Sequence, residues 1–366
     1  MTPLSFHSAF RGKRVWVSGH TGFKGSWLSQ WLLELGALVH GYALAPETTP
    51  ALFNQLGLTD RLEHEVADIR DLESVNQSIC DFQPDFVIHM AAQPLVRRSY
   101  VIPVETYETN VNGTIHVLDA LRDMNSPCAV VIVTTDKCYE NHELGNAYEE
   151  GDPLGGHDPY SSSKAMAEIA TAAYRNSYFK NHPVRIATAR AGNVIGGGDW
   201  AEDRIVPDAM RALNAGESIS VRNPVAVRPW QHVLEPLSGY LTLAARLAAE
   251  PQNNELTSAF NFGPGPDSNR TVADLVTEML KHRHGSWLDK SDPLAVHEAT
   301  LLNLSIEKAA QVLAWKPVWN FEETISKTTE WYDQVHHEAI NPLEITKRHI
   351  AEYQTAAGGF LSPSSL

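Results

Sequence analysis

The stretch "RVWVSGHTGFKG", Arg14–Gly25, joins an apolar, partly β-branched run to three glycines spaced three residues apart. The run has the composition of a short buried strand, and the residues that follow have the pattern of an amphipathic helix. Gly19, Gly22 and Gly25 permit a tight turn and let backbone amides and the helix N-terminus approach a pyrophosphate closely. The stretch therefore predicts a strand, a glycine-rich turn and a helix that bind a dinucleotide.

Five further β-rich runs follow along the chain and alternate with helix-length segments. Such alternation implies right-handed β-α-β crossovers and a mostly parallel, doubly wound sheet. The runs expected as strands are Arg14–Gly19, Ala37–Leu44, His64–Ile69, Asp85–Ala92, Ala129–Thr135 and Val184–Arg190. Gly25–Gly36 and Glu108–Met124 are two of the segments expected as helices. The chain is therefore predicted to be an α/β protein with a Rossmann-type sheet.

After Gly192 the regular alternation gives way to loops rich in glycine, proline and arginine, as in "GGGDWAEDRIVP" and "RNPVAVRPWQHV". This change predicts a smaller C-terminal lobe that covers the carboxyl edge of the sheet. We expect an NAD-binding domain at 10–191 with returning segments near 229–262, and a substrate-binding lobe mainly at 192–355. A flexible tail is expected at 356–366, where small and polar residues dominate.

The composition narrows the class of protein. The 366 residues are 43% hydrophobic and carry a formal net charge of -15, which supports one large domain or two unequal ones. The negative charge argues against a general nucleic-acid or anionic-membrane binder, because both rely on positive potential. The three cysteines are scattered and no apolar run is long enough to span a membrane, so a cytoplasmic protein is expected. The histidine pairs lack cysteine or carboxylate partners, so no metal site is expected.

The end of the second strand does not decide which dinucleotide binds. An acidic residue that accepts hydrogen bonds from the ribose hydroxyls is expected there, whereas residues 42–45 read "YALA". No arginine stands there to bind a 2′-phosphate either, so NAD is favoured over NADP, with Lys24 in the glycine turn as the counter-argument. Asp68, at the end of the third strand, suits the adenine amino group or the N-cap of the next helix.

A second group of polar side chains follows the fifth strand in "VVIVTTDKCYEN", Val130–Asn141. The first residues have the composition of a parallel strand that is buried on both faces. Thr135, Asp136 and Lys137 come directly after it. Ligands of α/β proteins bind at the carboxyl ends of such strands, so these three side chains are candidates for chemistry.

The stretch "DPYSSSKAMAE" places Tyr160 and Lys164 four residues apart, hence on the same face of a helix. An ammonium beside a phenol stabilises the phenolate, and lowering a tyrosine pKa from about 10 to near neutrality requires about 4 kcal/mol. Such a tyrosine takes an alcohol proton while hydride leaves the carbon. The spacing alone is common by chance, and its position after the strand that ends at Asp136 gives it weight.

Together these motifs resemble the extended short-chain dehydrogenase/reductase family. The resemblance spans roughly residues 10–335 and rests on "GHTGFKG", "DIRD", "HMAAQ", "NVNGT", "VTTDKCYEN", "PYSSSK", "RAGNVIGGGDW", "FNFGPG" and "LAWKPVWNFEETISKTTEWY". Within the family the chain is most similar to nucleotide-sugar 4,6-dehydratases, and among these to the branch that acts on CDP-glucose. The resemblance implies an NAD-dependent lyase that forms a 4-keto-6-deoxyhexose nucleotide for deoxysugar and O-antigen synthesis.

The resemblance also implies roles for the catalytic residues. Hydride leaves sugar C4, water is lost across C5 and C6, and hydride returns to C6. Tyr160, supported by Lys164, takes the O4 proton, and Thr135 hydrogen-bonds the same oxygen. Asp136 protonates the departing C6 hydroxyl, which requires a neutral carboxylic acid, the form that burial favours.

Lys137 departs from the family pattern, in which a glutamate removes the C5 proton. Two roles stay open for it. A desolvated, neutral lysine acts as the base, or a charged lysine stabilises the enolate oxygen at C4 while another group takes the proton. The base role is favoured.

Further site residues follow from the matching motifs. Those expected to bind the cofactor are Gly19, Thr21, Gly22, Phe23, Lys24, Gly25, Asp68, Ile69, Ala91, Ala92, Gln93, Asn110, Thr134, Tyr160 and Lys164. Those expected to bind the substrate are Gln93, Arg97, Asn193, Arg204 and Arg228. Amide and guanidinium donors suit the oxygens of a sugar-nucleotide pyrophosphate.

Other functions share parts of this pattern. A 4-epimerase or reductase would use Tyr160 and Lys164 but has no use for an acid such as Asp136. A dehydratase of GDP-, dTDP- or UDP-sugars also fits, because no residue pattern here reads the nucleobase. A non-catalytic NAD-binding sensor would not need Tyr160, Lys164 and the neighbouring acid Asp136 together. The relatives pair through two long helices, so a homodimer or homotetramer built on 108–124 and 160–180 is expected.

Overall fold

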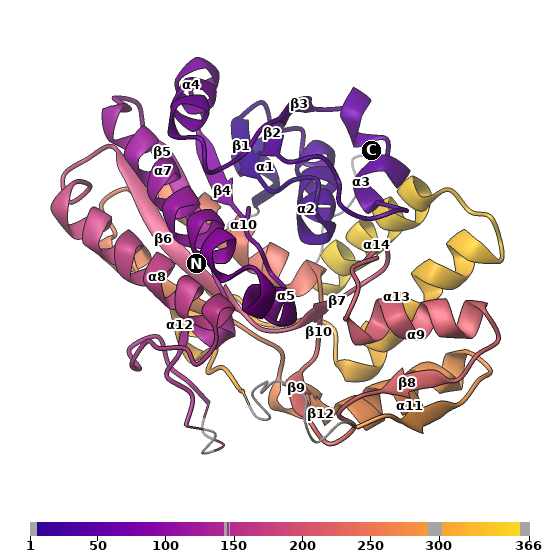
Figure 1. The fold of residues 1–366 in the computed structure, drawn as a ribbon. Helices are drawn as coiled ribbons and strands as arrows, with labels where there is room; N and C mark the ends of the chain where they lie inside the picture. Colours follow the sequence, from indigo (N-terminus) through magenta and orange to yellow (C-terminus); the bar gives the residue numbers. More distant parts are fainter. Residues whose placement is uncertain (1–5, 143–144, 146, 292–301, 359–366) are drawn as a thin grey trace.

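A seven-stranded sheet forms the centre of the molecule (Figure 1). The computed structural model describes residues 6–142, 145, 147–291 and 302–358. The strands of the sheet are β1 Arg14–Ser18, β2 Leu38–Ala43, β3 Glu63–Val66, β4 Phe86–His89, β5 Cys128–Val133, β6 Val184–Ala191 and β11 Ala259–Phe262. Their order is β11-β6-β5-β4-β1-β2-β3, and all neighbouring strands are parallel. The strand order reverses between β1 and β4, which opens a crevice at their carboxyl ends.

The predicted doubly wound α/β fold is confirmed, because all six expected strands are present in this sheet. The seventh strand, β11, pairs with β6 and lies in the segment expected to return to the first domain. The domain boundaries themselves stay a prediction.

Helices cover both faces of the sheet and build the second lobe. They are α1 Phe6–Phe10, α2 Phe23–Glu34, α3 Leu52–Gln55, α4 Leu72–Phe82, α5 Val96–Val101, α6 Pro103–Tyr107, α7 Gly113–Ala120, α8 Pro159–Ser177, α9 Ile205–Asn214, α10 Leu234–Ala249, α11 Val272–His282, α12 Glu307–Leu313, α13 Phe321–His336 and α14 Pro342–Ala356. Short helical turns are η1 Leu58–Asp60, η2 Glu108–Asn112, η3 Leu121–Asp123, η4 Asp136–Cys138, η5 Asn254–Leu256 and η6 Pro266–Ser268. None of the described helices is long and apolar enough to cross a membrane.

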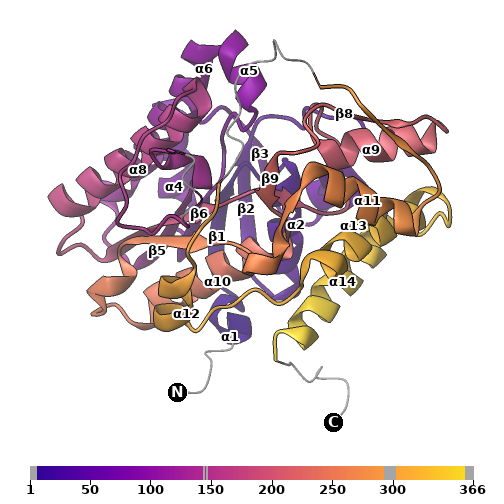
Figure 2. The same cartoon turned by 90° about the horizontal axis from the view of Figure 1, so that it is seen from below.

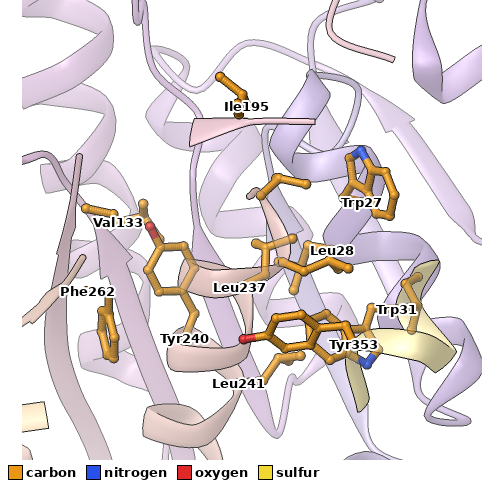
Figure 3. Packing of buried hydrophobic residues seen from close by; sticks show 14 of the residues in the cluster. Trp27, Leu28, Trp31, Val133, Ile195, Leu237, Tyr240, Leu241, Phe262 and Tyr353 are labelled. Atoms are coloured by element: carbon orange, nitrogen blue, oxygen red, sulfur yellow. The ribbon is translucent and has the colours of Figure 1, made fainter. Parts of the chain in front are cut away.

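The core lies on both faces of the sheet, which explains the unbroken apolar runs of the strands. In β5, Val130 and Ile132 pack into one cluster with side chains of α4 and α7. Val131 and Val133 alternate with them and belong to the larger cluster on the other face. Figure 3 shows part of that larger cluster, in which Trp31 of α2 contacts Tyr353 of α14 and Tyr240 of α10 contacts Phe262 of β11.

The segment 108–124 differs from the single long helix predicted for it. It consists of a π-helical turn at η2, the α-helix α7 and the 3₁₀ turn η3. Buried Asn110 lies in the π-helical turn, and its amide bonds the backbone of Gln93 and the hydroxyl of Ser163. These tertiary contacts compete with regular helical geometry, and π-helical turns mark such sites.

The smaller lobe contains α9, α11 and three two-stranded sheets beside the main sheet (Figure 1). Its strands are β7 Val194–Ile195, β8 Ile219–Val221, β9 Val227–Pro229, β10 Gln231–His232, β12 Asn269–Thr271 and β13 Trp287–Asp289. Figure 2 shows α5 and β8 on the side of the molecule opposite α1 and the end of α14. Of the expected tail, residues 359–366 lie outside the described part of the chain.

Candidate active site

The glycine turn between β1 and α2 leaves no room for a Cβ at Gly19 or at Gly25. Gly19 has a φ of +74°, and a Cβ on it would lie 2.8 Å from the backbone nitrogen of Ala91. A Cβ on Gly25 would lie 2.1 Å from the carbonyl oxygen of Gly19. No side chain caps the N-terminus of α2 at Gly22. The first amides of α2 therefore face the crevice without a side chain between them and a ligand.

The ends of β1 and β4 are joined by buried hydrogen bonds. The Ser18 hydroxyl accepts from the backbone nitrogens of Met90 and Ala91, at 3.0 and 3.1 Å. The same hydroxyl lies 2.7 Å from Nδ1 of His89, which is buried. These bonds fix the backbone of Met90 and Ala91 next to the glycine turn.

Asp68 lies beyond β3 and is paired with Arg70, whose Nη2 is 2.6 Å from Oδ2 of Asp68. Hydrogen bonds from Arg70 lower the pKa of the Asp68 carboxyl. The helix N-cap considered for Asp68 belongs instead to Asp71, which accepts from the backbone nitrogen of Ser74. Asp68 is therefore not required to cap the helix.

Lys24 reaches the catalytic end of the crevice. Its Nζ donates to the hydroxyl of Tyr240 at 3.3 Å, and that hydroxyl lies toward Val133 in Figure 3. Burial lowers the pKa of Lys24 to about 7, and the charges of Arg204 and Lys164 act in the same direction. Lys24 is thus directed toward β5 and not toward the end of β2, where a 2′-phosphate would be held. Lys24 therefore does not argue for NADP over NAD.

The segment after β5 forms a single 3₁₀ turn, η4, that begins at Asp136. The Thr135 hydroxyl donates to Oδ1 of Asp136 at 2.9 Å. Oδ2 of Asp136 is buried without a hydrogen-bond partner among the described atoms, and it would lie 2.8 Å from a Cβ on Gly192. Lys137 extends past this carboxylate, with Nζ 4.0 Å from Oδ1 of Asp136 and 3.5 Å from Oδ1 of Asn193.

Tyr160 and Lys164 lie in the first turns of α8, and both are buried. Lys164 Nζ donates to the carbonyl of Val133 at 3.3 Å. Burial raises the pKa of Tyr160 to about 12, while a hydrogen bond with the Thr135 side chain and the charge of Arg204 oppose the rise. In the protein without cofactor, desolvation of the phenolate outweighs the effect of its neighbours. The low tyrosine pKa expected from Lys164 together with a bound nicotinamide cation stays a prediction.

One cavity of about 910 Å³ unites these parts. It is lined by every predicted site residue except Asn110. Asn110 lies behind the wall and binds the backbone of Gln93, so its predicted contact with the cofactor would be indirect. Within the described residues there is no group of three or more histidines, cysteines or carboxylates suited to a metal ion.

The wall formed by the smaller lobe is rich in cations. Arg204 is held by Asp199, with Nη1 3.0 Å from Oδ2, and Arg228 is largely buried. Arg222 and Lys290 line the same cavity and were not predicted. Arg222 belongs to the phrase "RNPVAVRPWQHV" that singled out Arg228, whereas no sequence signal marks Lys290.

The family model for GDP-mannose 4,6 dehydratase matches residues 16–328. The chain belongs to this family. The CDP-glucose 4,6-dehydratase of Salmonella typhimurium strain LT2 is 47% identical to this chain over 356 residues, which are 95% of this chain and 98% of the relative. A probable dTDP-glucose 4,6-dehydratase of Sinorhizobium fredii is 26% identical over 348 residues, 87% of this chain and 92% of the relative.

Solved structures support the fold of this member of the GDP-mannose 4,6 dehydratase family. A dTDP-glucose 4,6-dehydratase from Bacillus anthracis, in complex with NAD, has a TM-score of 0.72 at 21% identity and covers 91% of this chain and 100% of that chain. A dTDP-glucose 4,6-dehydratase from Streptomyces venezuelae, with NAD and TYD bound, has a TM-score of 0.74 at 23% identity over 90% of this chain and 99% of that chain. At such identities the likeness concerns the fold alone.

Proposed function

We propose that this chain catalyses the NAD-dependent dehydration of CDP-D-glucose to CDP-4-keto-6-deoxy-D-glucose. The observation that carries the proposal is the meeting of Asp136, Lys137 and Tyr160 in one cavity with the glycine turn. The 47% identity to a CDP-glucose 4,6-dehydratase supports the choice of substrate. A cytoplasmic location is part of the proposal, and the free thiols of all three cysteines suit a reducing compartment.

The crevice fits a dinucleotide. The close backbone packing at Gly19 and Gly25, which only glycine allows, and the uncapped N-terminus of α2 suit a pyrophosphate held by backbone amides. Thr21, Asp68 and Ile69 would hold the adenosine half, and Ala91, Ala92 and Thr134 the nicotinamide half. NAD, when bound, accepts the hydride from C4 of the sugar and returns it at C6.

Tyr160 removes the proton from O4 of the sugar. Its phenolate requires donors, and Thr135 has one hydroxyl proton to give. That proton goes to Asp136 in the protein alone. When Asp136 carries its proton on Oδ2, Oδ1 is no longer charged and accepts more weakly, which leaves the Thr135 hydroxyl free to donate to the phenolate. Protonation of the acid and ionisation of the tyrosine therefore support one another.

Asp136 protonates the C6 hydroxyl as it leaves, through Oδ2, which has no hydrogen-bond partner among the described atoms. Lys137, 4.0 Å from the same carboxylate, takes the proton from C5. A neutral acid and a neutral amine thereby become a carboxylate and an ammonium side by side, so the two proton transfers create no unbalanced charge.

The substrate's pyrophosphate is held by the smaller lobe. Asn193, Arg204 and Arg228 supply amide and guanidinium donors, and Arg97 reaches the cavity from α5. Arg222 also lines this part and pairs with Asp203 and Asp208 in the protein alone. A pyrophosphate would replace these carboxylates as the partner of the guanidinium group.

The assembly is proposed to be a homodimer or homotetramer that pairs through segments 108–124 and 160–180, the second of which lies mainly in α8. This helix exposes Met166 and Ile169, and the neighbouring α5 and α6 expose Val101 and Val104. Figure 2 shows α5, α6 and α8 on one side of the molecule. A second copy that covers these apolar side chains would remove them from water.

The substrate is tested by a turnover panel of CDP-, UDP-, dTDP- and GDP-glucose, followed by alkali and detection of the 4-keto sugar by its ultraviolet absorbance. CDP-glucose is expected to give the highest kcat/KM. A higher value for another nucleotide would contradict the substrate while leaving the reaction in place. A C4 epimer as the sole product would contradict the reaction itself.

A further inference from the structure

One buried ion pair behind the active site has no part in the mechanism above. Glu168 of α8 and Arg190 of β6 face each other, with Oε2 2.9 Å from Nη2 and side chains 3% and 4% exposed. Removing two charges from water is costly, and apolar side chains would pack such a position at least as well. Stability alone therefore does not account for the pair.

The carboxylate of Glu168 holds the end of β5. The hydroxyl of Thr134 donates to Oε1 of Glu168 at 2.5 Å, and the hydroxyl of Thr188 donates to Oε2 at 2.8 Å. Thr134 directly precedes the catalytic segment 135–137. Lys164, one turn before Glu168 on α8, donates to the carbonyl of Val133. Lys164 and Glu168 of α8 thus form hydrogen bonds with Val133 and Thr134, the two residues that precede the catalytic segment.

The surroundings of this carboxylate are predominantly cationic. The titratable and charged groups that face the ion pair are Lys164 and Arg175 of α8, Cys138 and Tyr139 after β5, and Glu150 and Lys308. Burial lowers the pKa of Lys164 to about 8, and the charge of Glu168 is the strongest influence in the opposite direction. The charge on Lys164 therefore depends on its neighbour one turn along the helix.

Arg190, the ion-pair partner of Glu168, reduces the effect of the Glu168 charge on Lys164. Its Nη1 donates to the Tyr139 hydroxyl at 2.8 Å and to the carbonyl of Glu150 at 3.2 Å. The guanidinium lies 4.9 Å from the centre of the Tyr139 ring. These contacts tie the carboxylate to the segment beyond η4 as well as to β5.

We propose that Glu168 is a positioning residue that keeps Lys164 charged and holds the catalytic segment in place, with Arg190 as the counterion that limits its effect. The proposal rests on the proposed function in that Lys164 supports Tyr160. Residue 168 lies one turn beyond Lys164 on the helix face that carries Tyr160 and Lys164. Its ion pair with Arg190 connects this face to strand β6.

The test measures the titration of Lys164 directly, in the full chain without substrate. Acetic anhydride is applied over a range of pH, and acetylation of the peptide that contains Lys164 is quantified by mass spectrometry, because only the neutral amine reacts. In Glu168→Gln the midpoint is expected to fall by about 1–3 pH units. In Arg190→Gln it is expected to rise, because Glu168 then acts without its counterion.

Midpoint shifts of opposite sign in the two variants distinguish an effect of charge on Lys164 from a disturbed fold. A disturbed fold would expose Lys164 in both variants and move both midpoints the same way. Shifts in one common direction, or no shift in either variant, would overturn the proposal. If Glu168→Gln does not fold, Arg190→Gln alone carries the test, and an unmoved or lowered midpoint in it has the same consequence.

The hold on the catalytic segment is tested by two matched substitutions. Thr134→Val removes the bond between Glu168 and the end of β5 but leaves the charge, so kcat is expected to fall at unchanged KM and unchanged Lys164 midpoint. Thr188→Val removes the other hydroxyl bond to the same carboxylate and is expected to leave all three values unchanged. An equal fall of kcat in both variants would overturn the positioning role.

The proposed function and the proposed role of Glu168 can be contradicted independently of each other. If the wild-type chain does not turn over CDP-glucose, the proposed function is wrong, while the acetylation test of Glu168 stands. If the wild-type chain turns over CDP-glucose and neither midpoint moves, the role of Glu168 is wrong and the proposed function stands.

Discussion

At the scale of single residues, the reaction depends on one carboxyl group. Asp136 is 1% exposed, and one of its oxygens has no hydrogen-bond partner among the described atoms. Asp136→Asn keeps the shape and removes the proton donor, so formation of the 4-keto-6-deoxy product is expected to slow by at least about 100-fold. Rapid-quench analysis checks this result. Oxidation at C4, seen as NADH absorbance, should persist, and undiminished dehydration would contradict the role of Asp136.

A second residue-scale prediction concerns Lys137. If it is the C5 base, Lys137→Met is expected to stop the exchange of the C5 hydrogen with solvent deuterium. Mass spectrometry or NMR of substrate recovered from deuterated buffer measures this exchange. Retained exchange with weakened turnover would assign Lys137 to stabilisation of the C4 enolate instead, because the proton would then leave by another group.

The glycine turn and α2 carry the prediction at the scale of elements. In Gly25→Ala the new Cβ would meet the Gly19 carbonyl oxygen at 2.1 Å, so α2 must move away from β1. We expect a loss of about 1–3 kcal/mol in the free energy of unfolding and weaker NAD binding. Urea unfolding and calorimetry measure the two effects. Gly151→Ala is the control, because a Cβ there meets nothing within 4 Å, and an equal loss in both variants would contradict the account.

The elements also show what sequence can and cannot predict. The six strands were predictable because β-branched runs and glycine turns are local signals. The π-helical turn at 108–112 was not, because it depends on bonds from Asn110 to Gln93 and Ser163, which lie 17 and 53 residues away. In the site, Lys24 was identified, but its direction depends on Tyr240, 216 residues further along the chain. The high pKa of Tyr160 likewise follows from burial, which no motif reveals.

At the scale of the whole molecule, buried histidines make stability depend on pH. Burial lowers the pKa of His20 and of His89 to about 3. Both histidines stay neutral in the folded state, whereas in the unfolded chain a histidine, with a pKa of about 6.5, binds a proton as the pH is lowered. The free energy of unfolding therefore decreases as the pH is lowered from about 6.5 to 3. From pH 6.5 to 5 each group removes about 2 kcal/mol. Glu235, whose pKa burial raises to about 7, acts in the opposite sense between about 4.5 and 7.

His89→Asn isolates one of these contributions. The variant is expected to be less stable than the wild type at pH 7 but to lose less stability on acidification, because one titrating ring is gone. Urea unfolding at pH 7, 6 and 5 measures the difference. Parallel curves for the two proteins would contradict a neutral, buried His89.

The assembly supplies the second prediction at this scale. Replacing exposed Met166 and Ile169 of α8 by glutamate is expected to convert the oligomer into monomers, because the charges would be buried in the interface. Light scattering after size exclusion measures the mass. Leu288→Glu, on exposed β13, is the control and should leave the mass unchanged. A wild-type monomer would contradict the proposed assembly.

The central claim is an internal transfer of hydride from C4 to C6 within one cavity, and CDP-glucose labelled with deuterium at C4 tests it most directly. The account predicts a 4-keto-6-deoxy product that carries the deuterium at C6, with none released to NAD in solution. An unlabelled C6 methyl group, or deuterium returned to C4 in an epimerised sugar, would contradict it.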